Sequence, residues 1–232
     1  MGSKEAAWRI AIGLAMGGAV AVIAIAAPTV LGLAKDTWVP ASFVTHSLML
    51  SISVLLMAAL SRGGLTCYGF TRGSFRPTPA ILLWTVPTSV LSVLQYVAAK
   101  SGGAPSGIFS FSPLQTILFV WIYASICEEV FVRGLLQGFL LPLGTHRVTF
   151  LRRWPLSIPV IFGGLFFGAM HVVLWPRMGP QAIVPMTLAT ILGLVAGHYR
   201  EKTGSLAPAI VIHALFNIGG SLPGWVLTVL LG

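Results

Sequence analysis

Two adjacent glutamates, Glu128 and Glu129, lie inside the long apolar run Leu114–Leu143. The chain has only five acidic residues, so two of them side by side in such a segment need an explanation. A charged side chain at the centre of a bilayer costs about 2.5–3.5 kcal/mol on insertion scales. Sequences keep such groups when they are paired or do chemistry, and we interpret both acids as candidates for a functional site.

The spacing of these acids to Arg133 predicts different roles for them. Glu129 and Arg133 are four residues apart, share a helix face and are expected to form an ion pair. Glu128 points about 100° away and has no cation on its own face. Desolvation and the acidic neighbour should make Glu128 hold a proton more firmly, which suits a general base near neutral pH. The alternative is a packing network that only fixes the register of the helix.

Two later segments carry histidines at helical spacing. His171 lies deep in an apolar run, one turn after Phe167, where a single histidine is more often a core residue than a catalyst. His213 and Asn217 are four residues apart and therefore share a helix face. Both can donate hydrogen bonds, so the pair could stabilise a developing oxyanion. The alternative for this pair is hydrogen bonding between helices.

The composition indicates the elements that must position these residues. Of 232 residues, 56% are hydrophobic and 8% are charged, whereas soluble domains have about 25% charged residues. Apolar runs of spanning length, rather than alternating segments, exclude a β-barrel. We therefore predict an all-α, polytopic transmembrane bundle with seven or eight spanning helices.

The apolar runs give the bounds of these helices. We expect spans at Ile10–Leu33, Ala41–Ser61, Pro79–Ala99, Leu114–Leu143, Leu156–Trp175, Gln181–Tyr199 and Leu206–Gly219. A short last run, Leu222–Leu231, would span, re-enter or cap the bundle. We interpret the first run as a retained helix, because it is long for a signal peptide.

The basic residues predict an orientation with the N-terminus in the cytoplasm. Ten then lie inside: Lys4, Arg9, Arg62, Arg72, Arg76, Arg147, Arg152, Arg153, Arg200 and Lys202. Three lie outside: Lys35, Lys100 and Arg177. This bias follows the positive-inside rule. The net charge of +9 is thereby explained by topology, and we expect no nucleic-acid partner.

The polar residues can meet in one layer of this bundle. Glu128 and His171 are each about 15 residues from the cytoplasmic end and His213 about seven or eight, at about 1.5 Å per residue. These depths converge if the fourth span is tilted or extends past the interface. A water-using active site requires such convergence.

Three motifs in this order resemble the CPBP intramembrane proteases, the CAAX prenyl endopeptidase (Ras-converting-enzyme type) and bacteriocin-processing, or Abi, group. They are Glu-Glu-x-x-x-Arg, Phe-x-x-x-His and His-x-x-x-Asn, within Leu114–Gly219. The resemblance divides the chain into variable N-terminal helices with the external linker Ser101–Pro113 (1–113), a catalytic helical core (114–219) and a short apolar segment (220–232).

The resemblance also implies roles for the motif residues. Glu128 with His171 would activate a water that attacks a peptide carbonyl. His213 with Asn217 would form the oxyanion hole. The supporting residues would be Glu129, Arg133 and Phe167.

Other site chemistries receive less support. Glu128, His171 and His213 are acceptable zinc ligands, yet no His-Glu-x-x-His motif occurs, and we favour a mechanism without a metal or other cofactor. Cys127 points another way round the helix and is interpreted as packing. We interpret His46 as packed or interfacial.

We therefore predict an intramembrane endopeptidase in a bacterial inner membrane. Its substrate would be a membrane-associated or lipidated protein or peptide, cleaved at a CAAX tail or a C-terminal sorting signal. The alternative is a non-catalytic immunity or scaffold protein that uses the same network for helix packing. A transporter is disfavoured because inverted repeats are lacking. The oligomeric state is left open.

Overall fold

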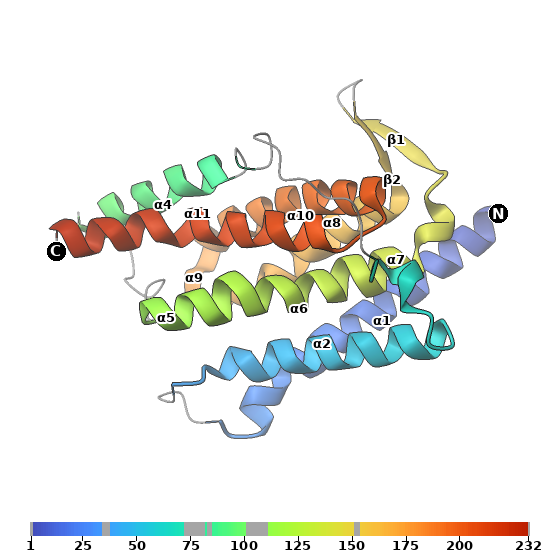
Figure 1. Ribbon diagram of the computed structural model, residues 1–232, viewed down its shortest axis with the longest axis horizontal. Coiled ribbons are helices and arrows are strands. Elements are labelled where there is room, and N and C mark those ends of the chain that lie inside the picture. The colour runs from blue at the N-terminus through green and yellow to red at the C-terminus, as the bar shows by residue number, and fades with distance from the viewer. Residues whose placement is uncertain are drawn as a thin grey trace.

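The computed structural model describes residues 2–33, 38–71, 82, 85–100, 111–150 and 154–231. Its helices lie side by side along one long axis, with a small β-hairpin at one end (Figure 1). The described helices of the N-terminal half are α1 (Ser3–Val30), α2 (Ala41–Leu60), the 3-10 turn η1 (Leu65–Tyr68) and α4 (Thr85–Lys100). The C-terminal half has α8 (Ile158–Met170), η6 (His171–Leu174), α9 (Trp175–Met178), η7 (Gly179–Ala182), α10 (Ile183–Thr203) and α11 (Ala207–Leu231).

A continuous helix through the middle of the bundle carries the two glutamates. It consists of α5 (Pro113–Gln115), the π-helical η3 (Thr116–Ala124), α6 (Ser125–Glu129), the π-helical η4 (Val130–Leu136) and α7 (Gln137–Phe139). Ser112 and Gln115 form a capping box at its start. Every residue of η4 is buried, because α2, α8 and α10 pack around it. The acids therefore lie next to the apolar core.

Small residues let the neighbouring helices approach closely. α8 packs against α10, and a Cβ added to Gly164 would lie 2.6 Å from the Leu194 side chain. α4 packs against α11, and a Cβ on Gly219 would lie 2.3 Å from Thr88 Oγ1. Glycine at helix contacts of this kind is common in membrane proteins. These contacts hold α8, which ends at the residue before His171, and α11, which carries His213 and Asn217.

The prediction of an all-α membrane bundle agrees with the structure, but the predicted seven or eight spanning helices are not confirmed. Within the described residues, five segments are long and apolar enough to cross a membrane. One of them, Ile158–Thr203, contains both α8 and α10. The last two predicted runs are one helix, α11, which continues through Pro223. The described helix of the third predicted span, α4, has only 16 residues.

The structure adds a hairpin that the hydropathy pattern did not predict. After the short 3-10 turn η5 (Leu141–Leu143), β1 (Arg147–Phe150) pairs antiparallel with β2 (Trp154–Ser157). The hairpin lies at the same end of the bundle as the N-terminus, and the C-terminus lies at the opposite end (Figure 1). Its strands have four residues each and are too short to register as a span.

Several residues used in the sequence predictions lie outside the described residues. They are Lys35, Arg72, Arg76, Arg152, Arg153, positions 79–81 and 83–84 of the third span, and positions 101–110 of the external linker. The side chain of Lys100 is likewise outside the described part.

Candidate active site

The ion pair expected within the central helix is present. Arg133 Nη1 lies 3.0 Å from Glu129 Oε1, and both side chains are fully buried. The Arg133 guanidinium also lies over the Phe167 ring, 4.6 Å from its centroid. Among the described residues, Nη1 has no aligned hydrogen-bond acceptor, so charge and ring contact hold the group in place. The pair thus connects the first motif to α8.

His213 connects the same ion pair to α11. Its Nδ1 donates a hydrogen bond to Glu129 Oε1 over 2.8 Å. Because the ring is fixed by this bond, its Nε2 is directed toward Glu128 Oε2, at 3.7 Å. A chain of contacts therefore runs from Arg133 through Glu129 to Nδ1 of His213 and fixes the orientation of the imidazole. A carboxylate often orients a functional histidine in this way.

Glu128 lies between two imidazoles. Its Oε1 accepts a hydrogen bond from His46 Nε2 at 3.0 Å, while its Oε2 faces His213. The side chains of His46 and Glu128 are 15% and 14% exposed, so the contact is largely shielded. The interpretation of His46 as simply packed or interfacial missed this contact. A usable signal was present, since His46 is the one titratable side chain in Ala41–Leu60.

His171 is linked to the rest of the site by its contacts with Phe167. Its Nδ1 donates a hydrogen bond to the Phe167 carbonyl over 2.8 Å, which leaves Nε2 of the neutral ring able to accept a proton. The Phe167 ring makes edge contacts with both imidazoles, with centroid distances of 4.9 Å to His171 and 5.4 Å to His213. Phe167 therefore acts as a spacer that sets the separation of the two histidines.

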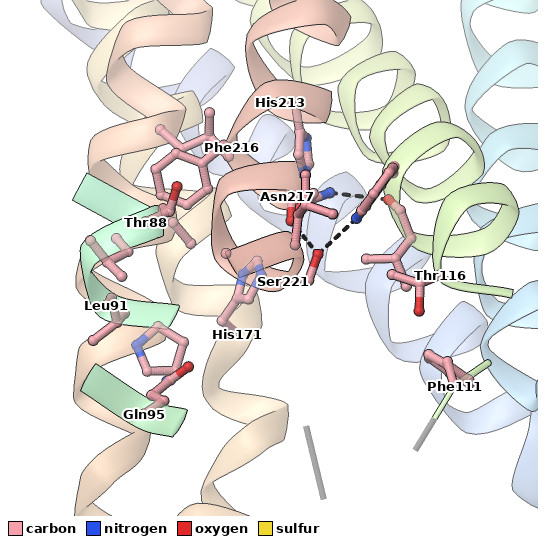
Figure 2. Close-up of a pocket in the computed structure, with 18 of the residues that line it drawn as sticks. Thr88, Leu91, Gln95, Phe111, Thr116, His171, His213, Phe216, Asn217 and Ser221 are labelled. Carbon is pink, nitrogen blue, oxygen red and sulfur yellow. Dashed lines mark hydrogen bonds between the residues drawn. The ribbon is translucent and has the colours of Figure 1, made fainter. Parts of the chain in front are cut away.

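A cavity of about 660 Å³ adjoins this cluster. His171, His213 and Asn217 line it, and Figure 2 shows all three on one side, facing Thr88, Leu91 and Gln95 of α4. Its other walls are mostly apolar side chains, among them Leu188, Leu192, Phe216, Leu222 and Trp225. A few polar groups in a cavity lined mostly by apolar side chains are typical of a site for a largely apolar ligand.

Asn217 is fastened to the central helix. Its Nδ2 donates to the Val120 carbonyl and to Ser125 Oγ, each over 3.1 Å. One residue further along this helix from Val120, Trp121 donates to Ser221 Oγ over 2.8 Å, and Ser221 in turn donates to the Asn217 carbonyl (Figure 2). Since both amide hydrogens are engaged, the oxyanion role implied by the resemblance requires the bond to Ser125 to be exchanged. The role itself stays a prediction.

The zinc alternative requires three ligands grouped around one ion. No three histidine, cysteine or acidic side chains among the described residues are placed to hold one ion. Glu128, His171 and His213, the zinc set considered above, are not grouped in this way in the described structure, and the metal-free mechanism stays a prediction. Cys127 is fully buried in the described structure, so it is poorly placed to act as a nucleophile.

Comparison with known families agrees with the motifs. Residues 110–219 match the family model described as type II CAAX prenyl endopeptidase Rce1-like. The match includes all three motifs and confirms the resemblance that they suggested. No curated protein and no solved structure matches the chain.

Proposed function

From the membership of residues 110–219 in the Rce1-like family, which indicates a CAAX-type protease, we infer that this chain is an intramembrane endopeptidase. One observation of the site supports this inference most. The carboxylate of Glu128 and the imidazole of His213 face one another at 3.7 Å, and the imidazole lines a largely apolar cavity. That gap exceeds a direct hydrogen bond, and one water bridges such a gap when it donates to the Glu128 carboxylate and accepts from an N–H at Nε2 of His213.

In the proposed reaction, Glu128 is the general base. It takes a proton from a water molecule as the water oxygen attacks the scissile carbonyl carbon. The carbonyl π electrons move to the oxygen, giving a tetrahedral oxyanion. Collapse breaks the C–N bond, and the leaving nitrogen takes the proton that Glu128 removed from the water, either directly or relayed through Nε2 of His171. His171 is suited to this exchange because its Nδ1 is already engaged and its Nε2 is available.

Two donors are proposed for the oxyanion. When both nitrogens of His213 carry hydrogen, Nδ1 stays on Glu129 and Nε2 donates toward the cavity. Asn217 contributes the second donor when the Ser125 hydroxyl releases its Nδ2. Removal of one such donor typically lowers kcat by about 100- to 1,000-fold.

The cavity supports a lipidated substrate. Rce1-like proteases act on membrane-associated prenylated proteins, and a flexible apolar chain fits a cavity lined largely by apolar side chains. Burying such a chain contributes about 0.8 kcal/mol per methylene. We therefore propose that the cavity holds the lipid and that the peptide bond lies against His171 and His213.

We propose a multi-pass protein of a bacterial inner membrane with its N-terminus in the cytoplasm. The ends of α2 and α10 and the β-hairpin lie at the N-terminal end of the bundle (Figure 1). The described basic residues near these elements are Lys4, Arg9, Arg62, Arg147, Arg200 and Lys202. Under the positive-inside rule, this distribution supports a cytoplasmic location for this end.

The proposed mechanism uses no metal. The arrangement of the described residues supports this choice, since they contain no three-ligand cluster. Purified protein should cleave at an unchanged rate after dialysis against a chelator, and metal analysis should find less than stoichiometric zinc. Loss of cleavage on chelation with recovery on added zinc would replace the metal-free mechanism.

The function is tested with fluorogenic peptides that end in a farnesylated CAAX sequence. Purified protein in micelles should release the last three residues, identified by mass spectrometry. The same peptide without the farnesyl group should be cleaved more slowly, because the cavity is not filled. Cleavage of neither peptide, nor of a membrane peptide with a C-terminal sorting signal, would favour the non-catalytic packing role.

A further inference from the structure

The hydrogen bond between His46 and Glu128 joins the proposed active site to a helix outside the family match. His46 is on α2, whereas the match begins at residue 110. α2 packs along α6 and η4, the segments around the two glutamates. We propose that His46 is a positioning residue for Glu128 and that α2 is therefore part of the catalytic apparatus. This proposal rests on the proposed function.

The geometry around Glu128 supports this role. His46 Nε2 holds Oε1 at 3.0 Å, so that Oε2 remains directed toward His213 at 3.7 Å. The carboxylate has no cation of its own helix on its face, since Arg133 pairs with Glu129. Without His46, the hydrogen bond to Oε1 that restrains rotation of the Glu128 carboxylate about its Cγ–Cδ bond would be lost. The base would then spend less time in the orientation that activates water.

His46 itself is fixed by contacts between α2 and η3. Its ring makes an edge contact with Tyr123, at a centroid distance of 6.5 Å. Tyr123 is stacked on Phe43 at 4.9 Å, and its hydroxyl lies 2.7 Å from Ser47 Oγ. Phe43 lies three residues before His46, and Ser47 lies one residue after it. The same turn of α2 therefore contacts Tyr123 and holds His46 against Glu128. A positioning residue has to be held in this way.

The test compares a substitution that removes the donor with one that keeps it. His46→Leu fills a similar volume and should lower kcat on the order of 100-fold with KM nearly unchanged. His46→Gln places an amide N–H near the position of Nε2 and should recover most of the rate. His198→Leu, at an exposed histidine of α10, is the matched control and should cleave like the unmodified protein. A His46→Leu enzyme with unchanged kcat would overturn the proposal.

Infrared spectroscopy gives a readout that does not depend on cleavage. The difference between unmodified protein and Glu128→Gln identifies the carboxyl bands of Glu128. His46→Leu should shift these bands, because it removes a hydrogen bond to Oε1, and His46→Gln should restore them. Unshifted bands would overturn the positioning role even if the protein is a protease. If the bands shift but the protein cleaves no peptide, the contact between His46 and Glu128 is confirmed. The proposed function is then rejected, and so is the catalytic role of His46.

Discussion

Nδ1 of His213 donates a hydrogen bond to Glu129 over 2.8 Å, although 84 residues separate the two in the sequence. The second glutamate of the pair therefore does more than neutralise Arg133 within its own helix. It fixes the imidazole of His213 so that the opposite nitrogen faces Glu128 and the cavity. The two adjacent acids thus face opposite nitrogens of one histidine. Glu129 orients the ring through Nδ1, and Glu128 faces Nε2 across the proposed position of the water.

This relationship predicts that Glu129 affects stability and catalysis separately. Glu129→Leu leaves Arg133 buried without a counter-charge and should cost about 3–5 kcal/mol of stability. The double variant Glu129→Leu with Arg133→Met should recover much of that stability, because an apolar pair can replace a buried ion pair. It should nevertheless cleave poorly, since His213 has lost its orienting carboxylate.

Thermal unfolding in detergent and the cleavage rate measure these two effects. A double variant that regains both stability and full activity would show that Glu129 is only a structural partner of Arg133. The single variant Arg133→Met provides the comparison in which the carboxylate remains on His213.

Asn217 can be separated from its own packing contacts. If it stabilises the oxyanion, Asn217→Ala should lower kcat by about 100- to 1,000-fold. Ser125→Ala removes one of its hydrogen-bond partners and frees an amide hydrogen, so it should change kcat by less than about tenfold. Equal, small rate losses in the two variants, together with equal decreases in melting temperature, would instead show that Asn217 only holds α11 against the central helix.

The cavity can be filled without touching the polar cluster. Gly220 lines the cavity, and among the described residues a Cβ there would have only the Thr88 Cβ within 4 Å, at 3.9 Å. Gly220→Leu should therefore raise KM for the farnesylated peptide and reduce the advantage of the lipid. Gly18→Leu on α1, where an added Cβ would have no atom of the described part of the chain within 4 Å, controls for the substitution itself. An unchanged preference for the lipid in Gly220→Leu would place the lipid elsewhere.

The sequence was sufficient to predict the motif helices and the internal ion pair. Helical spacing places Glu129 and Arg133 together whatever surrounds them, and a long apolar run around Glu128 implies a buried position. Membrane depth brought Glu128 and His213 together only on the condition that the fourth span is tilted or extended, and in the structure Glu128 Oε2 and His213 Nε2 are 3.7 Å apart.

Contacts between distant helices could not be predicted in the same way. The bond from His46 to Glu128 depends on which face of α2 meets α6, and a single polar residue in an apolar helix does not specify that face. The engagement of Asn217 by Ser125 depends on the rotation of α11 against the central helix. The division of the last helix into two runs was wrong for a local reason, because Gly220 and Ser221 interrupt the apolar run without ending α11.

The most direct test of the central claim is the substitution Glu128→Gln in purified protein, assayed with the farnesylated peptide. The amide keeps the shape of the side chain but cannot take a proton from water, so cleavage should fall at least about 100-fold. The melting temperature should stay nearly constant. Glu201→Gln makes the same change at an acid that contacts Arg147 and Ser157 at the hairpin, and it should retain activity. Cleavage by Glu128→Gln at the rate of the unmodified protein would contradict the assignment of Glu128 as the base.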